Sequence, residues 1–342
     1  MSIIMTGGGT GGHLAIIKAV KEQINSDKLI YIGSSMGQDR AWFGDDNQFS
    51  EKYFMNTRGV VNQGLLGKVK SLWLLSKATT QAYKILKKCD AKVVFCVGGF
   101  SAAPTSIAAL IARIPLVVHE QNAALGSLNK ILRKYASAFI SSYEENSPIK
   151  SYPIKEEFFN TAKPRNGKVQ NIFFAGGSQG AKAINNLALE LAPWLKEQNI
   201  SITHQAGEKN IEFVRNEYNK LNIEATVFGF TNEMASVMSG ADFAIARSGA
   251  STLWELSANG LPALYVPYPY AASDHQYHNA QFLVEQNMAW IVREDKIDIE
   301  AVKKMILNSK EIKSRSQKLL KSIANDGNKQ IASLLESYMI KG

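Results

Sequence analysis

The sequence predicts an α/β protein built from two doubly wound units, each with a parallel sheet covered by helices. Short apolar runs bounded by glycine alternate with amphipathic helical stretches along the whole chain. Such continuous apolar strands are typical of parallel sheets buried on both faces. Two stretches about half a chain apart, IIMTGGGTGG and IFFAGGSQGA, each indicate a strand, a glycine turn and a helix. This internal echo favours two similar units.

The length agrees with this division, because 342 residues with 45% hydrophobic content exceed what one core usually serves. The aperiodic segment from Ser151 to Lys168 is the candidate linker. We therefore predict an N-terminal domain over 1–153 and a second domain over 154–324. The tail, about 325–342, is expected to be an amphipathic helix that returns to the first domain.

The expected strands can be read directly from the apolar runs. Those of the first half are SIIMTG, KLIYIG, KVVFCVGG, PLVVHEQ and SAFISS. Those of the second half are NIFFAGG, ISITHQ, ATVFGF, DFAIAR, ALYVPY and MAWIV.

Charge and cysteine content narrow the function classes. Residues 1–150 hold 18 Lys and Arg against 10 Asp and Glu, a net +8, whereas the remainder holds 21 against 20, a net +1. The basic first half suits an anionic surface, but no nucleic-acid motif accompanies it. No targeting segment or membrane-spanning run is visible, so a cytoplasmic protein is expected. Cys89 and Cys96 are interpreted as reduced packing residues.

The most informative stretch is 240-GADFAIARSGASTLWELSANGLPALYVPY-268, a strand, a small-residue turn, a helix and a second strand. Ser251 is placed to cap the helix, whose first amides attract a phosphate. Glu255, one turn inside the helix, would accept hydrogen bonds from a pair of sugar hydroxyls, such as those of a ribose. The alternative is a solvated glutamate that complements the helix dipole.

Three glycine turns follow apolar strands: 7-GGGTGGH-13, 98-GGFSAAP-104 and 176-GGSQGA-181. The first satisfies G-x-G-x-x-G, which suggests a dinucleotide cofactor. However, the second strand ends in Gly33, Ser34 and Ser35, without the acidic residue that would hold an adenosine ribose. The turns together indicate one ligand site; alternatively, each only connects a strand to a helix.

In their order and spacing, GGTGGH, HEQN, GGSQGA, RSGASTLWE and DHQYHNA resemble the MurG-type N-acetylglucosaminyltransferase family of bacterial cell-wall synthesis. The resemblance covers nearly the whole chain. It implies the GT-B fold, two facing Rossmann-like domains with an interdomain cleft. It also implies transfer of GlcNAc from UDP-GlcNAc, with inversion, to the 4-hydroxyl of MurNAc in undecaprenyl-pyrophosphoryl-MurNAc-pentapeptide.

The same resemblance implies a donor site, residue by residue. Glu255 would bind the ribose, Gln276 the GlcNAc hydroxyls, and the backbone of Thr231 the uracil. The remaining donor contacts would come from Thr10, Gly11, Gly12, Asn122, Lys155, Ser178, Ala250, Ser251, Thr252, Leu253 and Trp254. Ser178, Asn122 and Gln276 also have ordinary interpretations, as an N-cap, a turn residue and a solvated helix residue. Two positions depart from the family pattern, since Ile16 replaces a proline and Lys155 an arginine.

His13 is the candidate for proton transfer, and with Glu255 it completes the catalytic prediction. It begins a helix, where the neutral imidazole that a general base requires is favoured. Alternatively, His13 positions the diphosphate or the acceptor. Helix amides can stabilise the departing UDP, and no Asp-x-Asp pair or ligand spacing is present, so we expect no metal and no cofactor.

The segment GLLGKVKSLWLLSKATTQAYKILKK explains the basic first half. On a helical wheel a core-facing stripe is expected, formed by Leu65, Val69, Leu72, Leu75, Tyr83 and Leu86. A membrane patch is expected on another face, formed by Leu66, Lys70, Trp73, Leu74 and Lys77, which would enter an anionic bilayer. The alternative is a wide core stripe beside solvated lysines.

The predicted location is therefore the cytoplasmic face of the plasma membrane, with no nucleic acid bound and other cell-wall synthesis proteins as further partners. Three other functions remain open: a UDP-GlcNAc epimerase of the same overall fold, a nicotinamide oxidoreductase, and a non-catalytic sugar-nucleotide-binding partner.

Overall fold

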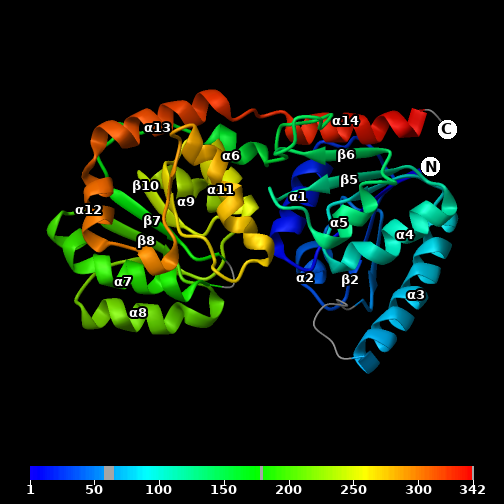
Figure 1. Cartoon of the computed structure of the whole chain (residues 1–342), viewed down its shortest axis with the longest axis horizontal. Helices are drawn as coiled ribbons and strands as arrows, with labels where there is room; N and C mark the ends of the chain where they lie inside the picture. Colours follow the sequence, from blue (N-terminus) through cyan, green and yellow to red (C-terminus); the bar gives the residue numbers. More distant parts are fainter. Residues whose placement is uncertain (58–64, 178–179, 341–342) are drawn as a thin grey trace. The chain divides into compact units, whose positions relative to one another are not determined.

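The computed structural model describes residues 1–57, 65–177 and 180–340, and side chains from Ser71 onward in the helix that begins at Leu65. The chain divides into two compact units (Figure 1). Unit 1 comprises Met1–Lys155 and Asp326–Gly342, and unit 2 comprises Glu156–Asn325.

Unit 1 contains a six-stranded parallel sheet in the order β3-β2-β1-β4-β5-β6. Its strands are β1 (Ser2–Thr6), β2 (Leu29–Ser34), β3 (Glu51–Met55), β4 (Ala91–Cys96), β5 (Leu116–Glu120) and β6 (Ala138–Ser141). Its helices are α1 (Gly11–Lys21), α2 (Asp39–Phe43), α3 (Leu65–Lys88), α4 (Ala103–Ala112), α5 (Ser127–Leu132) and α14 (Gly327–Ile340).

The edge strand β3 is absent from the sequence prediction. Among the described strands it pairs with β2 alone, and four of its five residues are partly or fully exposed, so EKYFM carries no continuous apolar run. Edge strands lack this signal because they are not covered on both sides. The predicted strands of the first half correspond to the other five.

The last helix of the chain, α14, belongs to unit 1. It contacts α1, β1 and β4 and buries Ile331, Ala332 and Leu335 (Figure 1). The Glu336 carboxylate accepts a hydrogen bond from the Asn25 amide at 2.8 Å. The C-terminal segment therefore completes the cover of the first sheet.

Unit 2 repeats the arrangement with the order β12-β11-β10-β7-β8-β9, again all parallel. Its strands are β7 (Asn171–Ala175), β8 (Ser201–Gln205), β9 (Thr226–Phe228), β10 (Phe243–Ala246), β11 (Ala263–Tyr265) and β12 (Trp290–Ile291). Its main helices are α6 (Glu156–Asn160), α7 (Lys182–Glu197), α8 (Ile211–Lys220), α9 (Met234–Gly240), α10 (Ala250–Ala258), α11 (His275–Glu285), α12 (Ile299–Leu307) and α13 (Ser309–Ser322). All six strands predicted for the second half are present.

The strand orders confirm the predicted fold class. In each unit the order reverses beside the first strand, between β1 and β4 and between β7 and β10. Doubly wound sheets bind ligands at the carboxyl ends of the strands at such a switch point. The glycine turn after β1 and the turn after β10 both lie at these positions.

The stretch predicted as a linker is packed rather than extended. Phe158 and Arg165 are buried, and the Arg165 guanidinium donates to the carbonyls of Met238, Ala241 and Asn259 at 2.7–3.1 Å. Burial lowers the pKa of Arg165 to about 10. Backbone acceptors thus compensate a buried charge, which periodicity cannot reveal.

Candidate functional site

The turn between β10 and α10 presents an uncapped helix start. Gly249 occupies the cap position with extended backbone, no described side chain caps α10, and the helix begins at Ala250. The prediction that Ser251 is the cap is wrong, because the cap position is Gly249, two residues earlier. The Ser251 hydroxyl instead donates to Glu255 Oε1 at 3.0 Å, so it orients the carboxylate expected to bind a diol.

The residues of α10 that were predicted to bind the sugar-nucleotide donor differ in burial. Leu253 and Trp254 are buried, and the Trp254 ring stacks on Phe282 with centroids 5.0 Å apart. The Leu253 amide donates to the Gly249 carbonyl at 3.0 Å. These two residues therefore anchor the helix, whereas the first-turn amides of Ala250, Ser251 and Thr252 are the ones suited to an anion.

Two side chains that sequence reasoning did not assign hold this turn. The Arg247 guanidinium donates to the carbonyls of Val266 and Pro267, each at 3.0 Å, and pairs with Glu294 at 2.8 Å. The buried Asn279 amide donates to the Ser248 carbonyl at 3.2 Å. The only sequence signal was the presence of these residues within RSGA and DHQYHNA.

Gln276 follows β11 and Thr231 follows β9, and three strands of the unit 2 sheet lie between β11 and β9. Gln276, in the first turn of α11, accepts from the Tyr268 amide at 2.9 Å. Before it, Ser273 and Asp274 both have positive φ, 53° and 50°, a strained conformation typical of functional loops. Thr231 follows β9, and its hydroxyl accepts from the Glu233 amide at 3.0 Å. The predicted Ser178 lies outside the described residues.

In unit 1, Thr10, Gly11, Gly12 and His13 form the start of α1. The His13 ring lies between two side chains: Nδ1 is 2.9 Å from Thr10 Oγ1, and Nε2 is 3.1 Å from Gln121 Nε2. With the amide in this orientation Gln121 donates, so Nε2 accepts and Nδ1 carries the proton toward Thr10. Gln121 comes from HEQN but was not predicted as a site residue.

Glu120 organises the HEQN loop that carries Asn122. The buried carboxylate accepts from the amides of Asn122 and Gly126, each at 2.9 Å, and from Asn129 Nδ2 at 3.0 Å. The neighbouring His119 is fully buried. Its pKa is lowered to about 3, mainly by burial and to a smaller extent by the nearby His13. A neutral His119 in the core is the result.

The α3 surface agrees only partly with its prediction. Leu72, expected to face the core, is 64% exposed, and its neighbour Trp73 is 62% exposed. In the second half of the helix Leu86 lies in the core and Tyr83 packs against it, as predicted, and Ala78, Ala82 and Ile85 contact the core as well. The side chains of Leu65 and Val69 lie outside the described residues. A helical wheel assumes one partner along the whole length, which this helix does not have.

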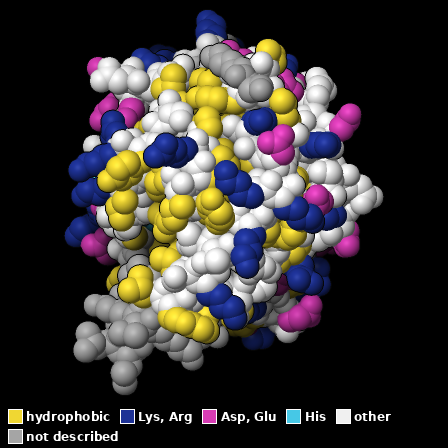
Figure 2. Space-filling view, turned by 90° about the vertical axis from the view of Figure 1, so that its right-hand side faces the viewer, with side chains coloured by type: hydrophobic (Ala, Val, Ile, Leu, Met, Phe, Trp, Pro, Cys, Tyr) yellow, Lys and Arg dark blue, Asp and Glu magenta, His cyan; other side chains and the backbone are white. Residues whose placement is uncertain are grey.

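The exposed surface of α3 therefore includes Leu72, which was not predicted to belong to the membrane patch. Leu74, which was predicted to belong to it, is half-buried. The Lys77 ammonium lies 5.5 Å from the centroid of the Trp73 ring. Figure 2 shows hydrophobic side chains mixed with Lys and Arg over this face of unit 1. The side chains of Leu66 and Lys70 lie outside the described residues.

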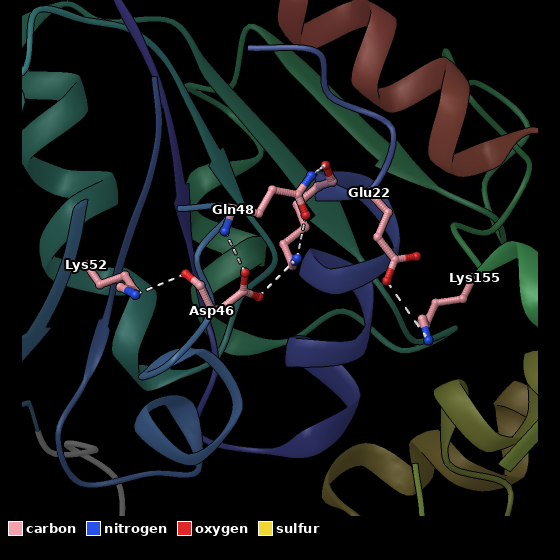
Figure 3. Close-up of polar contacts among 6 residues, drawn as sticks. Glu22, Asp46, Gln48, Lys52 and Lys155 are labelled. Carbon is pink, nitrogen blue, oxygen red and sulfur yellow. Dashed lines mark hydrogen bonds and ion pairs between the residues drawn. The ribbon is translucent and has the colours of Figure 1, made fainter. Parts of the chain in front are cut away.

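Lys155 closes unit 1 beside the C-terminal end of α1. Its ammonium is 4.0 Å from Glu22 Oε1 (Figure 3). Next to this pair, buried Lys21 binds Asp46 at 3.0 Å and Gln48 at 2.6 Å. The structure thus gives Lys155 an acidic neighbour within its own unit.

Within 1–57, 65–177 and 180–340, no group of three or more His, Cys, Asp or Glu is arranged to hold a metal ion. Across the same part of the chain, none of the helices combines the length and apolar character needed to cross a membrane.

Comparison with known proteins identifies the family. Residues 3–141 match the glycosyltransferase family 28 N-terminal domain, and residues 171–335 match the C-terminal domain of that family. A Sulfurovum sp. protein is 63% identical over 338 residues, 99% of each chain, and a Campylobacter jejuni subsp. doylei protein is 46% identical over 95% of this chain and 96% of its own. Both are named UDP-N-acetylglucosamine–N-acetylmuramyl-(pentapeptide) pyrophosphoryl-undecaprenol N-acetylglucosamine transferase.

Solved structures agree on the fold. Acinetobacter baumannii MurG superposes with a TM-score of 0.78 at 27% identity, covering 98% of this chain and 99% of that one. A UDP-N-acetylglucosamine 2-epimerase reaches 0.65 at 12% identity over 99% of this chain and 96% of its own, which is similarity of fold alone. The predicted family resemblance is confirmed: this chain belongs to the UDP-N-acetylglucosamine–N-acetylmuramyl-(pentapeptide) pyrophosphoryl-undecaprenol N-acetylglucosamine transferases of glycosyltransferase family 28.

Proposed function

We propose that this protein transfers GlcNAc from UDP-GlcNAc to the 4-hydroxyl of MurNAc in undecaprenyl-pyrophosphoryl-MurNAc-pentapeptide, with inversion at the anomeric carbon. The observation that carries the proposal is the 63% identity over 99% of both chains to a relative named as an N-acetylglucosamine transferase acting on N-acetylmuramyl-(pentapeptide) pyrophosphoryl-undecaprenol. The described site residues suit the reaction, since they offer an uncapped helix start, an oriented carboxylate and a held histidine.

Unit 2 supplies the donor contacts in this proposal. The first amides of α10 face the diphosphate, because they lack a side-chain cap and carry the positive end of the helix dipole. Glu255, oriented by Ser251, accepts from the ribose hydroxyls. Thr231 provides backbone contacts to uracil, Gln276 binds GlcNAc, and Arg247 keeps the turn in place.

Unit 1 supplies the base. His13 removes the proton of the MurNAc 4-hydroxyl as that oxygen attacks the anomeric carbon and the bond to UDP breaks. Thr10 and Gln121 hold the ring until the hydroxyl replaces Gln121 at Nε2, the accepting nitrogen. Thr10, Gly11, Gly12 and Asn122 contact the donor, and Lys155 adds positive charge near the diphosphate.

The leaving UDP is stabilised by helix amides rather than by a metal ion. Oriented N–H groups placed where charge develops can supply this stabilisation. Transfer is therefore metal-independent and needs no cofactor.

The acceptor determines where the enzyme works. A polyprenyl chain stays in the bilayer, so the protein associates peripherally with the cytoplasmic face of the plasma membrane through the exposed Leu72, Trp73 and Lys77 of α3. The half-buried Leu74 extends this surface, and other cell-wall synthesis proteins are partners there.

The test is UDP release by purified protein from UDP-GlcNAc, with and without a short-chain lipid-linked MurNAc-pentapeptide. Acceptor-dependent release with an inverted disaccharide product is expected, and excess EDTA should leave the rate within about twofold, as expected where amide dipoles replace the metal. UDP or UDP-ManNAc formed without acceptor would indicate the epimerase. Binding without turnover would indicate a non-catalytic partner.

A further inference from the structure

A buried aspartate lies behind the first glycine turn. Asp39 begins α2, shortly after β2, and its side chain is fully buried. Oδ2 accepts from the Gly9 amide at 2.8 Å, and Oδ1 accepts from the Ser34 amide at 2.8 Å. The Tyr31 hydroxyl lies 2.9 Å from Oδ1 and 2.8 Å from the Gly7 carbonyl, so it links the carboxylate to the start of the turn.

Three glycines make room for this carboxylate. A Cβ at Gly8 or Gly33 would lie 2.5 Å from Asp39 Oδ1, and a Cβ at Gly37 would lie 2.8 Å from Oδ2. At distances under 3.0 Å something must shift, so a side chain at any of these positions would displace the Asp39 carboxylate. Gly8 therefore leaves room for the Asp39 carboxylate, at a position of the first glycine turn that the G-x-G-x-x-G pattern leaves variable.

The contact between Asp39 and Gly9 also positions the start of α1. The Gly8 amide donates to the Gly98 carbonyl at 3.3 Å and the Gly9 amide to Asp39, so protein acceptors define the turn up to Gly9. Thr10 is the next residue and is the cap position of α1, with His13 inside the first turn. Because the helix is rigid, the position of Gly9 sets the position of the His13 ring.

We propose that Asp39 is a positioning residue for GlcNAc transfer: it holds Gly9 so that the first turn of α1 presents His13 to the reacting hydroxyl. The inference rests on the proposed function of His13. It also separates this site from a nicotinamide site, in which the acidic residue after the second strand faces the ribose. Here the end of β2 carries no acidic residue, and Asp39, which lies further along the chain, faces inward and accepts hydrogen bonds from the Gly9 and Ser34 amides.

Asp39→Asn tests the proposal at nearly constant size. Both carboxylate oxygens face an amide N–H, so either orientation of the new amide sets its NH₂ group against a donor. We expect kcat to fall about 10- to 100-fold, the range for slight misplacement of a catalytic group, with the KM for UDP-GlcNAc within about threefold of wild type. Hydrogen exchange in peptides covering residues 7–13 should accelerate.

The matched control is Asp46→Asn, which removes the partner of buried Lys21 in the same unit but does not contact the turn. It should lower the melting temperature at least as much while kcat and exchange over 7–13 stay near wild type. Gly37→Ala is a second probe, because its Cβ would lie 2.7 Å from Gly9 Cα, and it should reproduce the kinetic effect of Asp39→Asn.

Normal kcat and normal exchange over 7–13 in Asp39→Asn would overturn the proposal, as would an equal loss of kcat in Asp46→Asn. If Asp39→Asn does not fold, Gly37→Ala decides by the same measurements. Should wild type fail to transfer GlcNAc, the proposed function fails, whereas exchange over 7–13 still shows whether Asp39 holds the turn.

Discussion

Charged side chains near the glycine turn after β1, the HEQN loop and the turn after β10 form hydrogen bonds mainly with backbone groups. Glu120 accepts from loop amides, Arg247 donates to loop carbonyls, and Asp39 accepts from the glycine turn. Each satisfies backbone groups that a sharp turn leaves without partners. The residues expected to contact the substrate are thus held in position by other residues that are not expected to contact it.

Replacing His13 with Ala should mainly slow turnover. Loss of a general base costs about 10²- to 10⁴-fold in rate, whereas donor binding by unit 2 is preserved. Steady-state kinetics with both substrates would show a reduced kcat and a nearly unchanged KM for UDP-GlcNAc. His278→Ala, on the exposed face of α11, is the control. A near-normal rate for His13→Ala at saturating substrates would refute the base assignment.

Replacing Glu255 with Ala should mainly weaken donor binding. A hydrogen bond to a charged group is worth about 1.5–3 kcal/mol, which corresponds to roughly 10- to 100-fold in the KM for UDP-GlcNAc. Ser251→Ala, which removes only the orienting contact, should have a smaller effect in the same direction. With a donor analogue that lacks the ribose hydroxyls, wild type and Glu255→Ala should have nearly equal KM values for the donor. A persistent difference in KM would contradict the assignment of Glu255 to the ribose.

His204 gives the stability of unit 2 a dependence on pH. Asn185 Nδ2 donates to the Ala206 carbonyl, so its Oδ1 faces His204 Nε2, which carries the proton, and Nδ1 accepts from Tyr218. Burial lowers the pKa of His204 from 6.5 to about 4. Below pH 6.5 the unfolded chain therefore binds a proton that the folded chain does not.

Stability should consequently fall as pH decreases from about 6.5 toward 4, by at most about 1.4 kcal/mol per pH unit from this histidine. Urea unfolding at several pH values would measure the slope. His204→Gln, which keeps hydrogen-bonding groups without titrating, should flatten it; an unchanged slope would contradict this assignment.

At the scale of elements, the surroundings of α3 change along the helix. Its second half packs through Ala78, Ala82 and Ile85, whereas Leu72 and Trp73 are exposed beside Lys77. Apolar side chains flanked by lysines suit an anionic lipid surface.

Changing Leu72 and Trp73 together to Glu should weaken binding to vesicles containing phosphatidylglycerol by at least about tenfold, because each apolar side chain contributes about 1.5–3 kcal/mol when buried. Vesicle sedimentation would measure the change. Phe213→Glu, an aromatic residue of α8 exposed to a similar degree, should bind as wild type does. Equal binding by all variants would argue against α3 as the contact.

At the scale of the whole molecule, unit 1 is formed by two segments that are far apart in the sequence. α14 contacts α1, β1 and β4, so unit 1 cannot be completed until α14 is made. This arrangement makes the C-terminal helix a determinant of the stability of unit 1 rather than of unit 2.

Leu335→Ala should therefore destabilise unit 1 selectively, by about 2–5 kcal/mol, the usual cost of removing a fully buried leucine side chain. Hydrogen exchange should accelerate in peptides from β1 and β4 and remain unchanged in those from β7 and β10. Ile340→Ala, at an exposed position of the same helix, should have little effect. Uniform acceleration in both units would contradict this division.

The sequence by itself determined the fold class, eleven of the twelve described strands and the family, because buried parallel strands are continuous apolar runs and the ordered motifs are local. Only the tertiary structure decided the edge strand β3, the start of α10 at Ala250 and the exposure of Leu72, since each depends on what packs alongside. It alone also brought Asp39 to Gly9 and Gln121 to His13. Hydrogen bonds between residues that are distant in the sequence produce no periodic pattern, so only the tertiary structure identifies the side chains that hold the site.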